Sequence, residues 1–578
     1  MGVFYKCRQV VIAAFSLSVL FYSQAAPAAV SLPLRTKKGM VVSANPLASE
    51  AGISMLRKGG NAVDAAVATA MTISVVEPFS AGIGGGGFLL MSSSTGEIKA
   101  LDFRERAPLK ATKNMYLDAQ GKVRLNLSVN GYLAVATPGT VAGLYEVHHR
   151  YGKLPWQEVM KPAIALAQDG FVISQAVTWR SIQVLEPRKQ ALLDNPAARQ
   201  IFTHDGELYQ PGERLVQRDL ARTLREIAKN PQSFYTGNIA QAIATDMAKN
   251  GGLITLDDLK AYKPIWRTPI CGNFRTSKVC SMPPPSSGGV HLLQILNIIG
   301  DTDLKSLGWH SADALHLMVE AMKIAFADRS EYLGDPDFVK VPVQQLLSPA
   351  YTKKRRAEIS MNRARPSVEV KPGLGQSSPL LKSKESLETT HLNVVDEQRN
   401  AVSLTFTVNN GFGSGVVVPG IGMLLNDEMD DFAAAPGVPN VFGLIGGEAN
   451  AIAPRKTPLS SMTPTIVTEN GRLRLATGAP GGSTIITQVL QIVLNVLEYK
   501  MNAGEAVSVP RIHHQWLPDE LEVEPFSLDI ATVQDLQRRG HKLKEKSPWG
   551  NGNAIVVTPD GTLEGAADPR GEGSPRGF

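Results

Sequence analysis

Gly481 and Gly482 stand where a predicted strand meets a predicted helix, an arrangement that suits a negative charge. Arg472 to Thr477 reads as a strand, and it breaks at a run of Gly, Ala and Pro that ends with these two glycines. Ser483 then precedes a helix with one continuous apolar stripe. Free backbone N–H groups and the positive end of the helix dipole meet there, so the turn suits an anion or a developing oxyanion. Such turns also occur for geometric reasons alone.

Three polar residues, Thr405, Thr407 and Asn409, alternate with Phe406 and Val408 in a second predicted strand. Side chains two apart on a strand share a face, so the three polar groups are expected to point the same way. The same alternation is also typical of an ordinary half-exposed strand.

Two charged segments could recognise a charged ligand. Arg104 lies at the end of a strand-like run and is either a carboxylate ligand or part of a surface ion pair. The acidic stretch from Asp427 to Asp431 lacks the spacing of a calcium loop. It is either a site for a cationic group such as an ammonium or a polar turn.

Two other motifs suggest a nucleotide site and a metal site, but their surroundings argue against both. The run Gly82 to Gly87 is followed by no Gly-Lys-Ser/Thr, and the residues after it resemble a strand, so nucleotide binding is rejected. His513 and His514 are adjacent, so on an extended chain they point to opposite faces, and no further ligand completes a metal spacing. The sequence predicts no metal and no cofactor.

The chain changes character before Thr389 and Thr390. From Asn362 to Glu388 it is rich in Pro, Gly, Ser, Lys and Glu without apolar period, which predicts a flexible segment over 362–389. A strand-rich region follows at once, with strands expected at 391–395 and 400–408. A flexible stretch running directly into a strand suits a chain that is cut there and whose new end moves aside.

The N-terminus has the pattern of a secretory signal peptide over residues 1–28. Lys6 and Arg8 precede an apolar run of about 12 residues and then a small-residue stretch, with cleavage expected after Ala25 or Ala28. A membrane anchor is the alternative, but the run is well short of the roughly 20 residues that span a bilayer. The sequence therefore predicts a periplasmic or secreted protein with no membrane anchor after signal cleavage.

Composition is that of a globular protein. Hydrophobic residues make up 43% and charged residues 19% of the 578-residue chain, with a net charge of +6 that is too mild to indicate nucleic acid. Clear helices are expected at 61–76 and 312–327. Cys271 and Cys280 flank a predicted turn, and an oxidising compartment makes a disulfide plausible, but the sequence does not fix the register that it needs.

The segment Thr389 to Asp396 resembles the cleavage-site signature of the gamma-glutamyltranspeptidases. Further resemblances to this family follow in order along the chain, at Gly59 to Ala66, Asp102 to Glu105, Pro283 to Gly289, Asp328 to Ser330, Leu459 to Met462 and Gly478 to Ser483. The resemblance implies an α+β fold, a four-layer αββα sandwich of the N-terminal-nucleophile hydrolases. It also implies a large subunit, 29–389, and a small subunit, 390–578, which form a heterodimer after autocleavage.

The resemblance assigns the chemistry to Thr390. Its hydroxyl is expected to attack the carbonyl of Thr389, cut the chain and leave a free α-amine that then acts as the base. Thr407 would orient Thr390, and the N–H groups of Gly481 and Gly482 would form the oxyanion hole. A gamma-glutamyl ester on Thr390 would pass to water or to an amino-acid or peptide acceptor, with glutathione as the usual donor.

The resemblance also implies a clamp for both charges of the gamma-glutamyl group. Its α-carboxylate would be held by Arg104, Ser460 and Ser461. Its α-ammonium would be held by Asn409, Glu428 and Asp431. Two positions depart from common family residues: Glu428 where many bacterial members have Gln, and Phe442, in a lid loop over 436–447, where Tyr is frequent.

Two other functions are compatible with parts of this pattern. A cephalosporin (glutaryl) acylase would use the same nucleophile, but a glutaryl group lacks the ammonium that the clamp is expected to bind. A non-catalytic secreted scaffold protein would keep the fold and remain a single intact chain.

Overall fold

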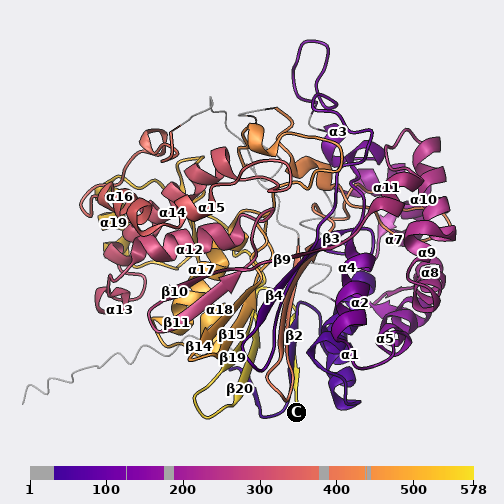
Figure 1. Cartoon of the computed structure of the whole chain (residues 1–578), viewed down its shortest axis with the longest axis horizontal. Coiled ribbons are helices and arrows are strands. Elements are labelled where there is room, and N and C mark those ends of the chain that lie inside the picture. The colour runs from indigo at the N-terminus through magenta and orange to yellow at the C-terminus, as the bar shows by residue number, and fades with distance from the viewer. Residues whose placement is uncertain (1–31, 125, 175–187, 376–388, 436–437, 439–443) are drawn as a thin grey trace, which may run out of the picture. The chain divides into compact units, whose positions relative to one another are not determined.

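The computed structural model describes residues 32–124, 126–174, 188–375, 389–435, 438 and 444–578. Two seven-stranded antiparallel sheets stack face to face and lie between two layers of helices (Figure 1). The expected four-layer αββα sandwich is therefore confirmed. The predicted signal peptide lies outside the described residues. Within them, no helix is both long and apolar enough to cross a membrane.

Both sheets combine strands from before and after Thr390. Sheet I contains, in order across the sheet, β1 (Leu34–Thr36), β20 (Leu563–Ala567), β19 (Asn553–Val557), β15 (Arg472–Gly478), β14 (Thr465–Glu469), β11 (Ser277–Ser281) and β10 (Ile270–Phe274). Sheet II contains β21 (Ser574–Gly577), β2 (Met40–Ser43), β12 (Thr390–Val395), β13 (Ala401–Thr407), β3 (Gly86–Ser92), β4 (Ile98–Phe103) and β9 (Ile265–Arg267).

One helical layer covers the outer face of sheet II. Its helices are α1 (Pro46–Arg57), α2 (Ala62–Val76), α4 (Thr140–Tyr151), α5 (Trp156–Asp169), α8 (Arg218–Lys229), α9 (Ser233–Thr236), α10 (Asn238–Lys249) and α11 (Leu256–Ala261). Helix α2 is buried along its whole length and packs on β12 and β13. Asn61, expected inside this helix, is its N-cap and accepts from two backbone N–H groups of the first turn.

The other helical layer covers the outer face of sheet I. Its principal helices are α12 (Gly288–Ile299), α14 (Ala312–Tyr332), α17 (Thr484–Leu497) and α18 (Ala503–Ser508), with α13 (Leu304–Leu307), α15 (Val343–Leu346), α16 (Pro349–Ala357) and α19 (Ile530–Arg539) beside them. Figure 1 shows α12, α14 and α17 on the opposite side of the sheets from α1, α2 and α4. Helix α14 continues five residues beyond its expected end at Ala327.

The remaining elements are short. They are α3 (Asn126–Val129), α7 (Pro196–Phe202), the pairs β5 (Phe171–Val172) with β8 (Arg214–Leu215) and β6 (Thr203–His204) with β7 (Glu207–Leu208), and the small sheet of β16 (Ile512–His513), β17 (Leu521–Val523) and β18 (Leu543–Glu545). The described residues also form the 3-10 helices η1 (Tyr132–Ala134), η2 (Ser367–Glu369), η3 (Glu428–Asp431) and η4 (Glu448–Asn450).

The hairpin of β10 and β11 places Cys271 directly opposite Cys280, and the two residues form a disulfide. This settles the question that the sequence left open.

Part of the segment expected to be flexible is packed. Residues Ser367 to Glu369 form η2, and the indole N–H of Trp516 donates to the carbonyl of Ser367 at 2.7 Å. Residues 376–388 lie outside the described part of the chain.

Candidate active site

Thr390 opens β12, a central strand of sheet II, and its side chain is completely buried. The Thr390 hydroxyl donates to Oε2 of Glu77, the residue that ends α2, at 3.2 Å. The hydroxyl of the preceding residue, Thr389, donates to Oγ1 of Thr407 at 3.3 Å. In the uncut chain, Thr407 therefore contacts Thr389, and Glu77, which the sequence did not single out, contacts Thr390.

The strand that carries Thr407 differs from its expected form. Strand β13 ends at Thr407, and Asn409 lies beyond it with a φ of 77°, so Asn409 does not share the strand face. Its backbone N–H still donates to Thr407 Oγ1 at 2.9 Å. Every residue of β13 is buried, which excludes the half-exposed strand.

Gly481 and Gly482 form the expected break between a strand and a helix. Strand β15 ends at Gly478, which lies against the ring of His391 on β12, so the turn and Thr390 lie at the same end of the stacked sheets. Both glycines have positive φ, 121° and 54°. Within the described residues, neither of their N–H groups makes a hydrogen bond. These donors are available to an oxyanion.

Ser483 occupies the N-cap position of α17, but its side chain makes no capping hydrogen bond. Its hydroxyl donates to Oε1 of Gln515 at 2.5 Å. The first two N–H groups of α17, those of Thr484 and Ile485, donate instead to the carbonyls of Gly481 and Gly482 at 3.0 and 3.2 Å.

The hydroxyl oxygens of Ser460 and Ser461 each accept a hydrogen bond from a neighbouring group. Ser460 Oγ accepts from the N–H of Met462 at 3.0 Å, and Ser461 Oγ accepts from Nη2 of Arg329 at 3.2 Å. No acceptor for either hydroxyl hydrogen is found in the part of the chain that the structure describes. Both hydroxyls are thus oriented to donate, as a carboxylate ligand requires.

Arg329 was not assigned a role from the sequence, although it lies in one of the family-like segments. It is buried near the end of α14, and its Nε donates to Ser287 Oγ at 3.0 Å. Within the described residues it forms no ion pair with a carboxylate. Burial lowers the pKa of Arg329 to about 10, so it remains a cation at neutral pH. A buried cation without a paired carboxylate favours a ligand that brings one.

Arg104 is only 1% exposed and pairs with two of the residues expected to bind an ammonium. Its Nη1 lies 2.5 Å from Oε1 of Glu428, and its Nη2 donates to Oδ2 of Asp431 at 2.5 Å. Glu105 is buried beside them. One guanidinium therefore shares its charge among three carboxyl groups.

This excess of carboxyl groups keeps protons in the site. Burial raises the pKa of Glu105 to about 7 and raises the pKa of Glu428 well above its ordinary value. Burial also raises the pKa of Asp431, against the opposing effect of Arg104. The carboxyl groups of the cluster are consequently partly protonated near neutral pH.

Asn409 completes the acidic side of the site. Its Nδ2 donates to the backbone carbonyl of Asp427 at 3.1 Å, and within the described residues its Oδ1 makes no hydrogen bond. An amide oxygen next to an acidic cluster can accept from an ammonium. The expected stretch from Asp427 to Asp431 is thus η3 with its cap, a turn that presents carboxyl groups.

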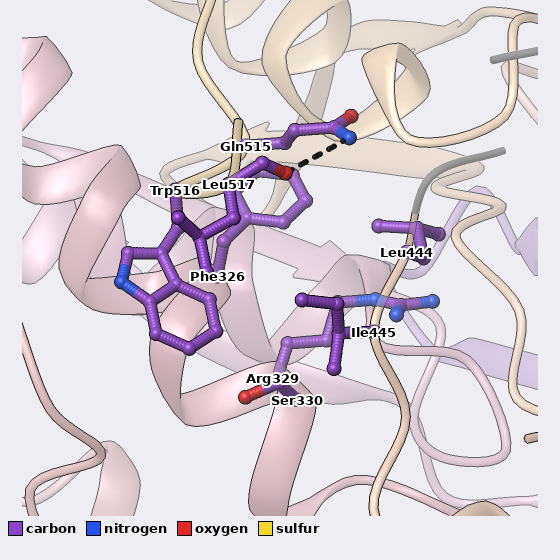
Figure 2. Close-up of a pocket in the computed structure, with 8 residues that line it drawn as sticks. All are labelled: Phe326, Arg329, Ser330, Leu444, Ile445, Gln515, Trp516 and Leu517. Carbon is purple, nitrogen blue, oxygen red and sulfur yellow. Dashed lines mark hydrogen bonds between the residues drawn. The ribbon is translucent and has the colours of Figure 1, made fainter. Parts of the chain in front are cut away.

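A small pocket lies beside Arg329 (Figure 2). Figure 2 shows the guanidinium extending toward Leu444 and Ile445, at the end of the predicted lid loop, with Trp516 and Phe326 on the other side. The backbone N–H of Gly447 donates to the carbonyl of Ser330 at 2.8 Å, which fixes the loop end to α14. Phe442 lies outside the described residues.

One buried group, His316, Glu320 and His541, has ligand atoms close enough together to hold a metal ion. These atoms already have partners. Nδ1 of His316 lies 2.7 Å from Nε2 of His541, and Lys323 forms an ion pair with Glu320. A cation there would have to separate the two imidazoles beside an existing ammonium.

Two stacked antiparallel sheets between helical layers, with a buried threonine at the start of a central strand, define an N-terminal-nucleophile hydrolase. The sequence profile of the gamma-glutamyltranspeptidases matches residues 48–578, and the chain belongs to this family.

Individual relatives agree with this assignment. The chain is 49% identical to the glutathione hydrolase proenzyme of Escherichia coli (strain K12), over 97% of both chains. It is 40% identical to the acylase ACY 1 proenzyme of Pseudomonas sp. (strain SE83), over 94% of both. The crystal structure of cephalosporin acylase from Bacillus halodurans matches with a TM-score of 0.83 at 31% identity, over 97% of this chain and 99% of that one.

Proposed function

We propose that this chain is the proenzyme of a gamma-glutamyltransferase and glutathione hydrolase. Thr390 cuts the chain after Thr389 and yields a large subunit, 29–389, and a small subunit, 390–578, that remain together as a heterodimer. Relatives of this chain are named proenzymes, which supports the cut. So do the buried threonine at the start of β12 and the interleaving of both parts in each sheet.

The cut prepares Thr390 for turnover. Its new α-amine has an ordinary pKa of about 7.7 to 8.0 and can take the proton of its own hydroxyl near neutral pH. The hydroxyl then attacks the gamma-carbonyl of the donor, and the N–H groups of Gly481 and Gly482 receive the oxyanion. The resulting ester passes its gamma-glutamyl group to water or to an amino-acid or dipeptide acceptor. We propose that Thr407, whose hydroxyl lies next to residue 389, orients Thr390 once the chain is open.

The choice of substrate rests on one observation: the site contains a group of hydrogen-bond donors and a group of acidic residues and acceptors. Ser460 and Ser461 offer two hydroxyl hydrogens, with the cation of Arg329 directly behind Ser461. Asn409, Glu428 and Asp431 offer acceptors. A gamma-glutamyl group carries a carboxylate and an ammonium on one carbon, so it fits both. Arg104 pairs with Glu428 and Asp431, and a bound carboxylate would compete with these partners for its guanidinium.

Two anilide substrates distinguish this function from that of an acylase. The relatives from Pseudomonas sp. (strain SE83) and Bacillus halodurans carry that name. We expect the processed enzyme to hydrolyse gamma-glutamyl anilide faster than glutaryl anilide, because only the first has the ammonium. Asp431→Asn should lower kcat/KM for the gamma-glutamyl anilide about 10- to 100-fold, since a charged hydrogen bond is lost, and leave the glutaryl anilide nearly unchanged. Faster glutaryl turnover by the wild type would contradict the proposal.

The raised pKa values predict that donor affinity depends on pH. Because burial raises the pKa of Glu105 to about 7, the cluster is partly neutral below that pH and gains negative charge above it. An ammonium binds better to the ionised cluster, so KM for a gamma-glutamyl donor should fall as pH rises. A group with this pKa gains up to about tenfold in ionised fraction between about pH 6 and 8.

The measurement is KM for gamma-glutamyl anilide across that range, in the wild type and in Glu428→Gln. The variant replaces one of the interacting carboxyl groups by an amide of equal size, so its KM should vary less with pH. A wild-type KM that rises with pH would show that the cluster does not bind the ammonium.

A further inference from the structure

Before the chain is cut, the base proposed for turnover does not exist. The nitrogen of Thr390 is then part of a peptide bond, and its lone pair is delocalised into the carbonyl of Thr389. A threonine hydroxyl alone is a weak nucleophile and needs a base to take its proton. The first cut therefore requires a base from elsewhere in the chain.

We propose that Glu77 is that base. The inference rests on the proposed function, because it concerns the same cut between Thr389 and Thr390. The Thr390 hydroxyl donates to Oε2 of Glu77 at 3.2 Å, within the range for proton transfer to a general base. Glu77 is only 2% exposed and Thr390 is fully buried, so bulk water does not separate the two groups. Before the cut, the hydroxyl and the carboxylate belong to one continuous chain.

The fold holds the Glu77 carboxylate in place from two directions. Glu77 ends α2, and its backbone N–H donates to the carbonyl of Ile73. The hydroxyl of Ser80 donates to the same Oε2 at 3.0 Å. The carbonyl of Ser80 in turn accepts from the backbone N–H of Val408, directly after β13, at 3.3 Å. The turn after α2 is thus attached to the strand beside Thr390, which fixes the distance between base and nucleophile.

The shift to the ester needs only these groups, and the opening of the ester needs one water molecule. Glu77 takes the hydroxyl proton of Thr390 as Oγ1 bonds to the carbonyl carbon of Thr389. The bond from that carbon to the nitrogen of Thr390 breaks, and the nitrogen receives the proton from Glu77. The product is an ester with a free α-amine. Water then adds to the ester, the bond to Oγ1 breaks, and the carboxyl group of Thr389 and the hydroxyl of Thr390 are released.

The test follows processing of the full chain in a cell-free translation and chase, with the uncut and cut chains separated on a denaturing gel. In Glu77→Gln, we expect the cleavage rate to fall about 100-fold or more, as for loss of a general base. Glu77→Asp should recover part of the rate. Glu77→Ala should be slow, and formate added to the chase should accelerate it, because a small carboxylate can occupy the vacated space.

Glu498→Gln is the matched control. Glu498 is also buried at the end of a helix, α17, where it pairs with Arg275, so its loss tests a structural role alone. We expect it to be cut at close to the wild-type rate. Formate rescue cannot follow from misfolding, so it separates the base from a structural role even if Glu77→Ala is less stable.

The outcomes distinguish the two proposals. Wild-type processing of Glu77→Gln would overturn the role of Glu77 and leave the proposed cut intact. So would a slow Glu77→Ala that formate does not accelerate. A wild-type chain that is not cut, or whose new N-terminus is not Thr390, would overturn the proposed function itself.

Discussion

Replacing Thr390 by alanine leaves the chain uncut and without turnover. In the proposed mechanism, both reactions use the same oxygen, first against the carbonyl of Thr389 and then against the gamma-carbonyl of the donor. Alanine keeps the backbone of β12 and removes only that oxygen and a methyl group from a buried site. We expect activity to fall by about 10⁴-fold or more, as when a covalent nucleophile is removed. The measurements are a denaturing gel for the cut and hydrolysis of gamma-glutamyl anilide for turnover.

Two further variants serve as controls for this result. Thr390→Ser retains the hydroxyl and should still be cut. Thr468→Ala removes another buried strand hydroxyl, on β14, and should be cut and active like the wild type. If Thr390→Ala still divides between residues 389 and 390, Thr390 is not the nucleophile of the cut.

The parts of the site that depend on local sequence could be predicted. The turn at Gly481 and Gly482 follows from a strand, two glycines and an apolar helical stripe that are consecutive in the chain. The sandwich itself was inferred from family-like segments rather than from periodicity. Periodicity had even suggested a half-exposed β13, because alternation alone does not tell whether the polar face meets water or a second sheet. Here that face meets sheet I, where Ser403 Oγ donates to the carbonyl of Thr477 at 3.1 Å.

The parts that depend on distant contacts could not be predicted. Glu77 and Thr390 are 313 residues apart, and nothing near Glu77 indicates which strand the end of α2 approaches. Helix α14 extends past its last apolar position because its charged residues find buried partners. Asp328 accepts from Gln294 and Tyr351, and Arg329 donates to Ser287 and Ser461. An apolar stripe ends where such residues begin, so the pattern placed the helix end too early.

Replacing Gly481 by alanine should lower kcat about 10²- to 10³-fold, the usual effect of losing one oxyanion donor. Its φ of 121° is rarely adopted by a residue with a side chain. An alanine Cβ would also lie 2.5 Å from Thr484 Oγ1. The peptide must rotate or shift to relieve both, which moves the N–H away from the oxyanion. The donor's charged groups bind elsewhere, so KM should change little.

The measurement is kcat per mole of small subunit, so that incomplete processing does not lower the apparent rate. Gly471→Ala is the control for a glycine with positive φ: its φ is 75°, nothing lies within 4 Å of the added Cβ, and it sits at the other end of the β14–β15 hairpin. Equal kcat in the two variants would show that Gly481 does not donate to the oxyanion.

The cut also passes through an oxyanion, at the carbonyl of Thr389. If the same turn receives both charges, Gly481→Ala slows processing and turnover together. If only turnover slows, the cut relies on other donors, and the base at Glu77 then supplies a larger share of its acceleration.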